Sequence, residues 1–76
     1  MIREHDCIVL TEAIPGDDLV AGDVGTVVHV HTNAQAYEVE FTTLTGQTVA
    51  VTTVLPNQLR PVTRRDLTHV RELAVS

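Results

Sequence analysis

Two histidines and a glutamate are the residues whose types and spacing most readily suggest chemistry. His29 and His31 are two positions apart, so on a strand both side chains project from the same face. A hairpin between residues 25–31 and 36–42 places Glu38 opposite His29. Two imidazoles and a carboxylate can hold zinc or another divalent metal, but the sequence offers no further ligand. We therefore expect an exposed cross-strand His–Glu pair, with no metal and no cofactor.

The single cysteine is the other candidate for chemistry. Cys7 would be a nucleophile only if it were exposed beside a base such as His5 or His69. A lone cysteine in a strand is more often a small buried apolar side chain, which is what we expect here. Neighbouring acids such as Asp17 and Asp18 work as acid–base pairs only where they line a cleft. No catalytic signature remains, so we expect that the chain is not an enzyme.

The charged residues divide between an acidic first loop and an arginine-rich end. The 76 residues include ten acidic side chains against five arginines and no lysine, for a formal charge of −5. Proteins that bind phosphate backbones need the opposite balance, so a basic protein partner fits better than nucleic acid. The residues expected to contact it are Glu12, Asp17, Asp18, Asp23, Arg64, Arg65 and Arg71. Binding of RNA or DNA at the arginine-rich end is the alternative.

A pattern of short strands positions these residues. Alternation of apolar and polar residues is cleanest over residues 36–42, and residues 21–53 read as three successive strands joined by tight turns. A first strand is expected over residues 5–11, and a last one over residues 59–62 after one helical turn at 56–59. Five short strands with a long first loop predict an all-β, SH3-like barrel, because a small sheet must curl to bury its apolar face.

The turns set an expected register. A four-residue turn at residues 32–35 places Val28 opposite Val39, and a three-residue loop ending at Gly46 places Val51 on the other side of Val39. The inner face of the three-stranded meander is then expected to consist of Val28, Val30, Tyr37, Val39, Phe41, Val49 and Val51.

A short amphipathic helix is expected after the barrel of residues 1–62, within residues 63–76. Apolar residues recur at helical spacing over residues 64–75, namely Leu67, Val70, Leu73 and Ala74. Two arrangements stay open. The apolar stripe packs on its own barrel, or it binds a partner or a second copy of the chain in a homodimer.

Two stretches resemble known families. Asp6-x-Ile8-x-Leu10, a loop and the glycine–valine pattern of residues 22–30 look like KOW-type SH3-like domains, although this loop is acidic where RNA-binding members are basic. G-D-V-G-T-V-V-H-V at 22–30, A-Y-E-V-E-F at 36–41 and L-R-P-V at 59–62 resemble bacterial proteins of the domain of unknown function 4926 family. That resemblance implies an SH3-like barrel without a known activity, and it suggests a place among toxin–antitoxin-like genes.

The sequence contains no feature typical of a secreted or membrane protein. One cysteine excludes an intramolecular disulfide, and no apolar run approaches the roughly 20 residues of a membrane span. The charged start has no signal-peptide core. We therefore expect a cytoplasmic bacterial protein that binds another protein, as the neutralising member of a pair encoded together.

Overall fold

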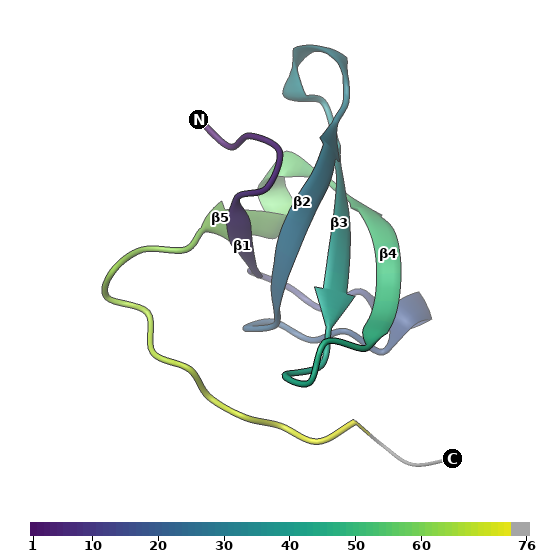
Figure 1. Ribbon diagram of the computed structural model, residues 1–76. Coiled ribbons are helices and arrows are strands. Elements are labelled where there is room, and N and C mark those ends of the chain that lie inside the picture. The colour runs from purple at the N-terminus through teal and green to yellow at the C-terminus, as the bar shows by residue number, and fades with distance from the viewer. Residues whose placement is uncertain (74–76) are drawn as a thin grey trace.

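The computed structural model describes residues 1–73, which form one all-β sheet (Figure 1). The strands are β1 (Cys7–Leu10), β2 (Val24–Val30), β3 (Tyr37–Thr42), β4 (Thr48–Val54) and β5 (Leu59–Pro61). They lie antiparallel in the order β4-β3-β2-β1-β5, and the sheet is not closed. Three 3₁₀ turns, η1 (Pro15–Asp17), η2 (Thr32–Ala34) and η3 (Pro56–Gln58), connect strands. No helix among residues 1–73 is long and apolar enough to cross a membrane.

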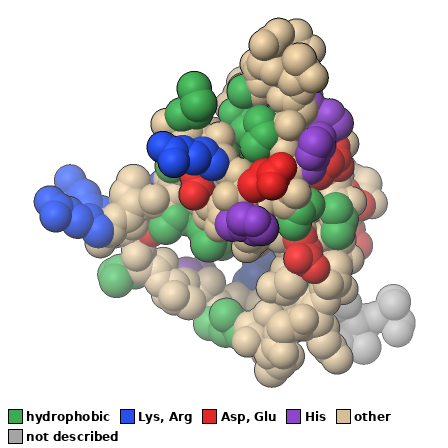
Figure 2. Space-filling view, turned by 45° about the horizontal axis from the view of Figure 1, so that its top comes forward, with side chains coloured by type: hydrophobic (Ala, Val, Ile, Leu, Met, Phe, Trp, Pro, Cys, Tyr) green, Lys and Arg blue, Asp and Glu red, His purple; other side chains and the backbone are tan. Residues whose placement is uncertain are grey.

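The core lies against one face of the curved sheet and takes one residue from the first loop. Its buried side chains are Ile8, Leu10, Leu19, Val27, Tyr37, Val39, Phe41, Val54 and Leu59. Gly25 is pressed against this core, since a Cβ there would lie 2.5 Å from Val39 Cγ1 and 2.7 Å from Phe41. Such distances are shorter than packed side chains permit. Other hydrophobic side chains remain on the surface, where Figure 2 shows them as separate green groups.

The all-β class is confirmed, and each of the five expected strands is present within a residue or two of its predicted bounds. The helical turn expected before the last strand is also present, as η3. The register of both hairpins is as predicted next to their turns. Farther along, each hairpin contains one irregularity that shifts the pairing by one residue.

In the first hairpin the shift lies in β2. His29 lies opposite Glu38, as predicted, but Val27 rather than Val28 lies opposite Val39. Val28 is therefore the extra residue of a β-bulge, and it is exposed. The predicted inner face is wrong at this position because its alternation was continued through the bulge.

The second hairpin contains the same kind of shift. Val49 is the extra residue of β4, so that Ala50 rather than Val49 lies opposite Phe41. A shift of one residue turns every later side chain of a strand to the other face. Val51, predicted to face inward, is consequently 57% exposed, whereas Val54 is fully buried. The bulges escape prediction because in both strands the extra residue is a valine, which suits either face.

The helix expected over residues 64–75 is absent from the described part of that range, and Ala74 and Val75 lie outside the described residues. Residues 62–73 instead form an extended tail. It leaves β5, swings out from the sheet and passes below the ends of the strands (Figure 1). A helix this short is marginally stable unless its apolar face is packed, and the tail has no such packing.

Thr63 and Asp66, at the start of the expected helix, are joined by hydrogen bonds in a turn. Asp66 accepts hydrogen bonds from the N–H of Thr63 at 2.7 Å and from its hydroxyl at 3.2 Å. The Thr63 carbonyl accepts the N–H of Asp66 at 3.1 Å. These hydrogen bonds close a turn and do not start a helix, so the apolar spacing of residues 64–73 was wrongly taken as helical.

Candidate functional site

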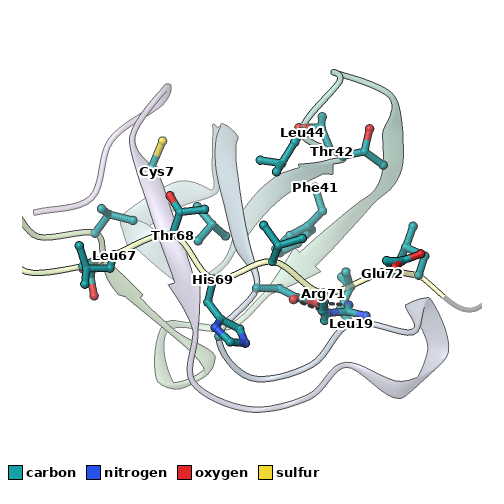
Figure 3. Close-up of a pocket in the computed structure, with 18 residues that line it drawn as sticks. Cys7, Leu19, Phe41, Thr42, Leu44, Leu67, Thr68, His69, Arg71 and Glu72 are labelled. Carbon is teal, nitrogen blue, oxygen red and sulfur yellow. Dashed lines mark hydrogen bonds and ion pairs between the residues drawn. The ribbon is translucent and has the colours of Figure 1, made fainter.

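The tail and the sheet enclose a groove of about 680 Å³ (Figure 3). One wall consists of residues from β1, β2, β3 and the loops beside them. The other wall is the tail itself, residues 66–73. Six exposed apolar side chains line the groove, and we refer to them as the apolar rim: Val24, Leu44, Val62, Leu67, Val70 and Leu73.

The apolar rim is not part of the core. Leu67 is 94% exposed and Leu44 is 82% exposed, although a leucine is among the residues most often found inside proteins. The two side chains belong to opposite walls of the groove, one on the tail and one in the turn between β3 and β4. Neighbouring exposed apolar side chains that line one hollow are typical of an interaction surface.

An ion pair joins the far end of the tail to the acidic loop. Arg71 donates from Nε to Asp23 Oδ1 at 2.8 Å and from Nη2 to Asp23 Oδ2 at 2.5 Å. It also donates to the carbonyl of Asp18 at 3.2 Å. The hydrogen bond from Arg71 lowers the pKa of Asp23, and the same bond raises the pKa of Arg71. Asp23 and Arg71 were predicted to bind a partner from separate regions, but the structure places them in contact with each other.

A second ion pair holds the near end of the tail. Arg60 on β5 donates from Nη1 to Asp66 Oδ2 at 3.0 Å and from Nη2 to Oδ1 at 2.7 Å. The hydrogen bond from Arg60, followed by that from the Thr63 N–H, holds the pKa of Asp66 well below its usual range. Both ends of the tail are thus attached by bidentate arginine–carboxylate pairs, the geometry in which such pairs are strongest.

A protein-family model matches most of the chain. The family model described as a domain of unknown function, DUF4926, matches residues 4–61. The chain belongs to the DUF4926 family. The matched range includes all five strands and ends before the tail, so it contributes the sheet wall of the groove. No curated protein and no solved structure matches the chain.

The other predicted contact residues of this DUF4926 protein lie beside the groove or on the tail. Asp17 and Asp18, at η1, make no side-chain hydrogen bond within residues 1–73. They line a second hollow, of about 600 Å³, which shares Leu19, Arg71 and Leu73 with the groove. The acidic loop therefore continues the surface of the groove.

Two of the predicted arginines and one predicted acid do not line either hollow. Arg64 and Arg65 are exposed on the tail and make no ion pair within the described residues. Glu12 accepts a hydrogen bond from Gln58 at 3.1 Å, which links the first loop to η3. The prediction missed Val24 and Leu44 altogether, because an exposed valine in a strand and a leucine in a turn carry no signal in the sequence.

Each of the two histidines lies near an acidic side chain, and His31 is hydrogen-bonded to its neighbour. His31 Nε2 lies 2.7 Å from Glu38 Oε2, and His29 Nδ1 lies 3.8 Å from Glu4 Oε2. The hydroxyl of Thr53 donates to Glu38 at 2.6 Å, and this bond, followed by that of His31, lowers the pKa of Glu38. Among residues 1–73 no group of three potential ligands could hold a metal ion. The side chain of Glu38 thus binds His31, although its backbone lies opposite His29.

Cys7 is exposed and lines the groove, so the expectation of a buried cysteine is wrong. The residue is the first of β1, and the three residues after it are all buried. His69, named as a possible base, lines the same groove from the tail. No hydrogen bond joins the Cys7 thiol to an imidazole in the part of the chain that the structure describes.

Proposed function

We propose that this DUF4926 protein is a small acidic protein-interaction module that binds a partner in the groove beneath its tail. The apolar rim supports this proposal, because its side chains line both walls of one groove and are left exposed by the chain itself. Burying apolar surface is favourable by about 25 cal/mol per Å². A partner that fills the groove would therefore be stabilised by burying the side chains of the apolar rim.

The charge around the groove supports a basic partner. Asp17 and Asp18 continue its surface, and the chain as a whole carries a formal charge of −5. Complementary charge speeds association and selects among partners. The occupant we propose is therefore a protein segment that presents apolar side chains to the rim and basic side chains to the acidic loop.

A neutralising role is the specific form of this proposal. In it, the acidic loop and groove cover a basic active site or binding groove on a protein encoded next to this one. The resemblance to small bacterial proteins among toxin–antitoxin-like genes supports it, and so does the absence of ion-pair partners for Asp17 and Asp18 within residues 1–73.

We also propose that this five-stranded sheet, although its two edge strands do not pair with each other, has the SH3-like fold. The long first loop, the two tight hairpins and the 3₁₀ turn before the last strand support this assignment. So does the return of β5 to the side of β1. The DUF4926 match itself carries no statement about barrel closure.

The nucleic-acid alternative has less support. Arg60 and Arg71 are each engaged by an aspartate, which leaves Arg64 and Arg65 as the unengaged basic pair on the described part of the tail. Binding to a phosphate backbone takes several uncompensated basic side chains, and the overall charge opposes it.

The test is co-expression with the product of the adjacent gene, followed by titration calorimetry on the purified pair. Val24→Ser is expected to weaken binding about tenfold or more, the loss typical of a buried interface residue. Leu55→Ser is the matched control, since Leu55 is similarly exposed but does not line the groove. Equal affinity of both variants and the wild type would overturn the groove as the binding site.

The charge of the loop is tested separately. Asp17→Lys combined with Asp18→Lys is expected to weaken the same complex and to make its affinity less dependent on salt, because a steering attraction has become a repulsion. If the double variant binds as tightly as the wild type at low salt, the acidic loop does not contact the partner. If the wild type does not bind the adjacent gene product, the neutralising role is wrong.

A further inference from the structure

The two edges of the sheet are built differently. The edge strand β5 has three residues, and it includes Arg60 and Pro61. A charge and a proline are features by which proteins protect a sheet edge from pairing with another strand. The other edge strand, β4, has seven residues, T-V-A-V-T-T-V, with neither a charge nor a proline. It forms the margin of the sheet in Figure 1.

The outer side of β4 has no hydrogen-bonding partner. Its ladder runs to β3 alone, and within residues 1–73 no other backbone hydrogen bond reaches Thr48–Val54. In an antiparallel sheet, alternate residues of an edge strand turn both N–H and C=O away from their neighbour, so about half of these groups point outward. A strand of this length, rich in valine and threonine and open along one side, is a template for a further strand.

We propose that β4 pairs with β4 of a second copy of this chain, in a symmetric antiparallel dimer. Two-fold symmetry places the centre of the seven-residue strand, Val51, opposite its counterpart in the second copy. Val51 is the apolar residue that the second bulge turned outward, and pairs of β-branched side chains across antiparallel strands are stabilising. The sheet then continues from one copy into the other.

Charge favours a second copy as the occupant. Two chains that each carry −5 repel each other over most of their surface, but residues 41–59 contain no charged residue or histidine. The nearest acid on β3, Glu40, lies opposite Val51. In the dimer the two Glu40 positions are three strand spacings apart, about 14 Å, which exceeds the screening length of about 8 Å in physiological salt. A basic partner would gain no such advantage at an uncharged strand.

This inference does not rest on the proposed function. No residue of Thr48–Val54 lines the groove beneath the tail, and Val49 alone of this strand lines the second hollow, beside Asp17 and Asp18. The dimer is also measured on the purified chain alone, so its failure and the failure of partner binding are distinguishable.

The first test is the mass of the purified full chain in solution, by sedimentation equilibrium across the micromolar range. The wild type is expected to reach the mass of two chains, and Val51→Lys is expected to remain at the mass of one, because it places a charge at the centre of the edge. Val28→Lys is the control, since it adds the same charge at an exposed position of the interior strand β2, and it is expected to dimerise. A monomeric wild type, or equal dimerisation of both variants, would overturn the proposal.

The second test concerns the register. Directly opposite residues of antiparallel strands have Cα atoms about 4.5–5.5 Å apart, which a disulfide can span. In a Cys7→Ser background, Val51→Cys is expected to form a covalent dimer on mild oxidation, and Leu55→Cys, which lies beyond the end of β4, is not. Equal yields from the two positions would show that the copies do not meet in this register.

Discussion

The sheet and the tail both contain many aliphatic residues, but the sheet buries them in a core and the tail leaves them exposed. In the sheet, side chains such as Val27 and Val39 are fully buried, whereas on the tail Leu67 and Val70 are exposed. The sheet is held by its core. The tail is held by two bidentate arginine–aspartate pairs at its ends. Ion pairs near a protein surface contribute little to stability, so we expect that the tail can be displaced at little cost while the sheet cannot. In the proposed function, this difference allows a partner to enter the groove between them.

The largest effect is expected for a change that adds a methyl group to the packed core. Gly25→Ala forces a methyl group to within 2.5 Å of Val39 Cγ1, and we expect it to lower the free energy of unfolding by about 1–3 kcal/mol. Urea denaturation measures this value. The matched control is Gly16→Ala, because nothing lies within 4 Å of a Cβ at Gly16, and it is expected to change stability little. Similar losses in both variants would show that Gly25 is not held against the core.

An intermediate effect, confined to the tail, is expected from acid. The pKa values of Asp23 and Asp66 are lowered in the folded chain. Their ion pairs therefore stabilise the tail at pH values above the ordinary aspartate pKa of about 3.9, and this stabilisation is lost as the pH falls through the lowered values. We expect nuclear magnetic resonance relaxation to show tail amides becoming mobile on acidification before the sheet amides do.

Asp23→Asn is the control for the acid experiment. It removes the charge that Arg71 binds, so the far end of the tail is expected to be mobile already at neutral pH, with the sheet unchanged. If the tail amides of the wild type keep the order of the sheet amides throughout the titration, the ion pairs do not hold the tail.

The smallest effect is expected for a change to an exposed side chain of the tail. Leu67→Ser is predicted to change the free energy of unfolding by less than about 0.5 kcal/mol, because the side chain is 94% exposed and contributes no buried surface. Thermal and urea denaturation would both measure it. A loss comparable to that of Gly25→Ala would mean that the tail packs on the sheet in solution, and the groove would then be closed.

Strand existence could be predicted from the residues because it depends on neighbours along the chain. The alternation in β3 and the glycine before β4 act over a few positions, and both hairpins formed where expected. Which side chains of β2 and β4 face the core could not be predicted in full. In each strand a single extra valine turns the residues on one side of it to the other face of the sheet. Which valine is extra is seen only in the strand pairing of the folded sheet.

The candidate site likewise has features that the sequence predicts and features that it does not. Composition and local pattern are sufficient to predict the all-β class, the family, the acidic loop and the arginine-rich end. The folded arrangement was needed to show that this end is an extended tail, that Arg71 binds Asp23 across 48 positions, and that Leu44 and Leu67 lie on the walls of one groove. The physical reason is that these contacts join residues far apart in the chain, whose meeting depends on where the whole sheet brings the two ends.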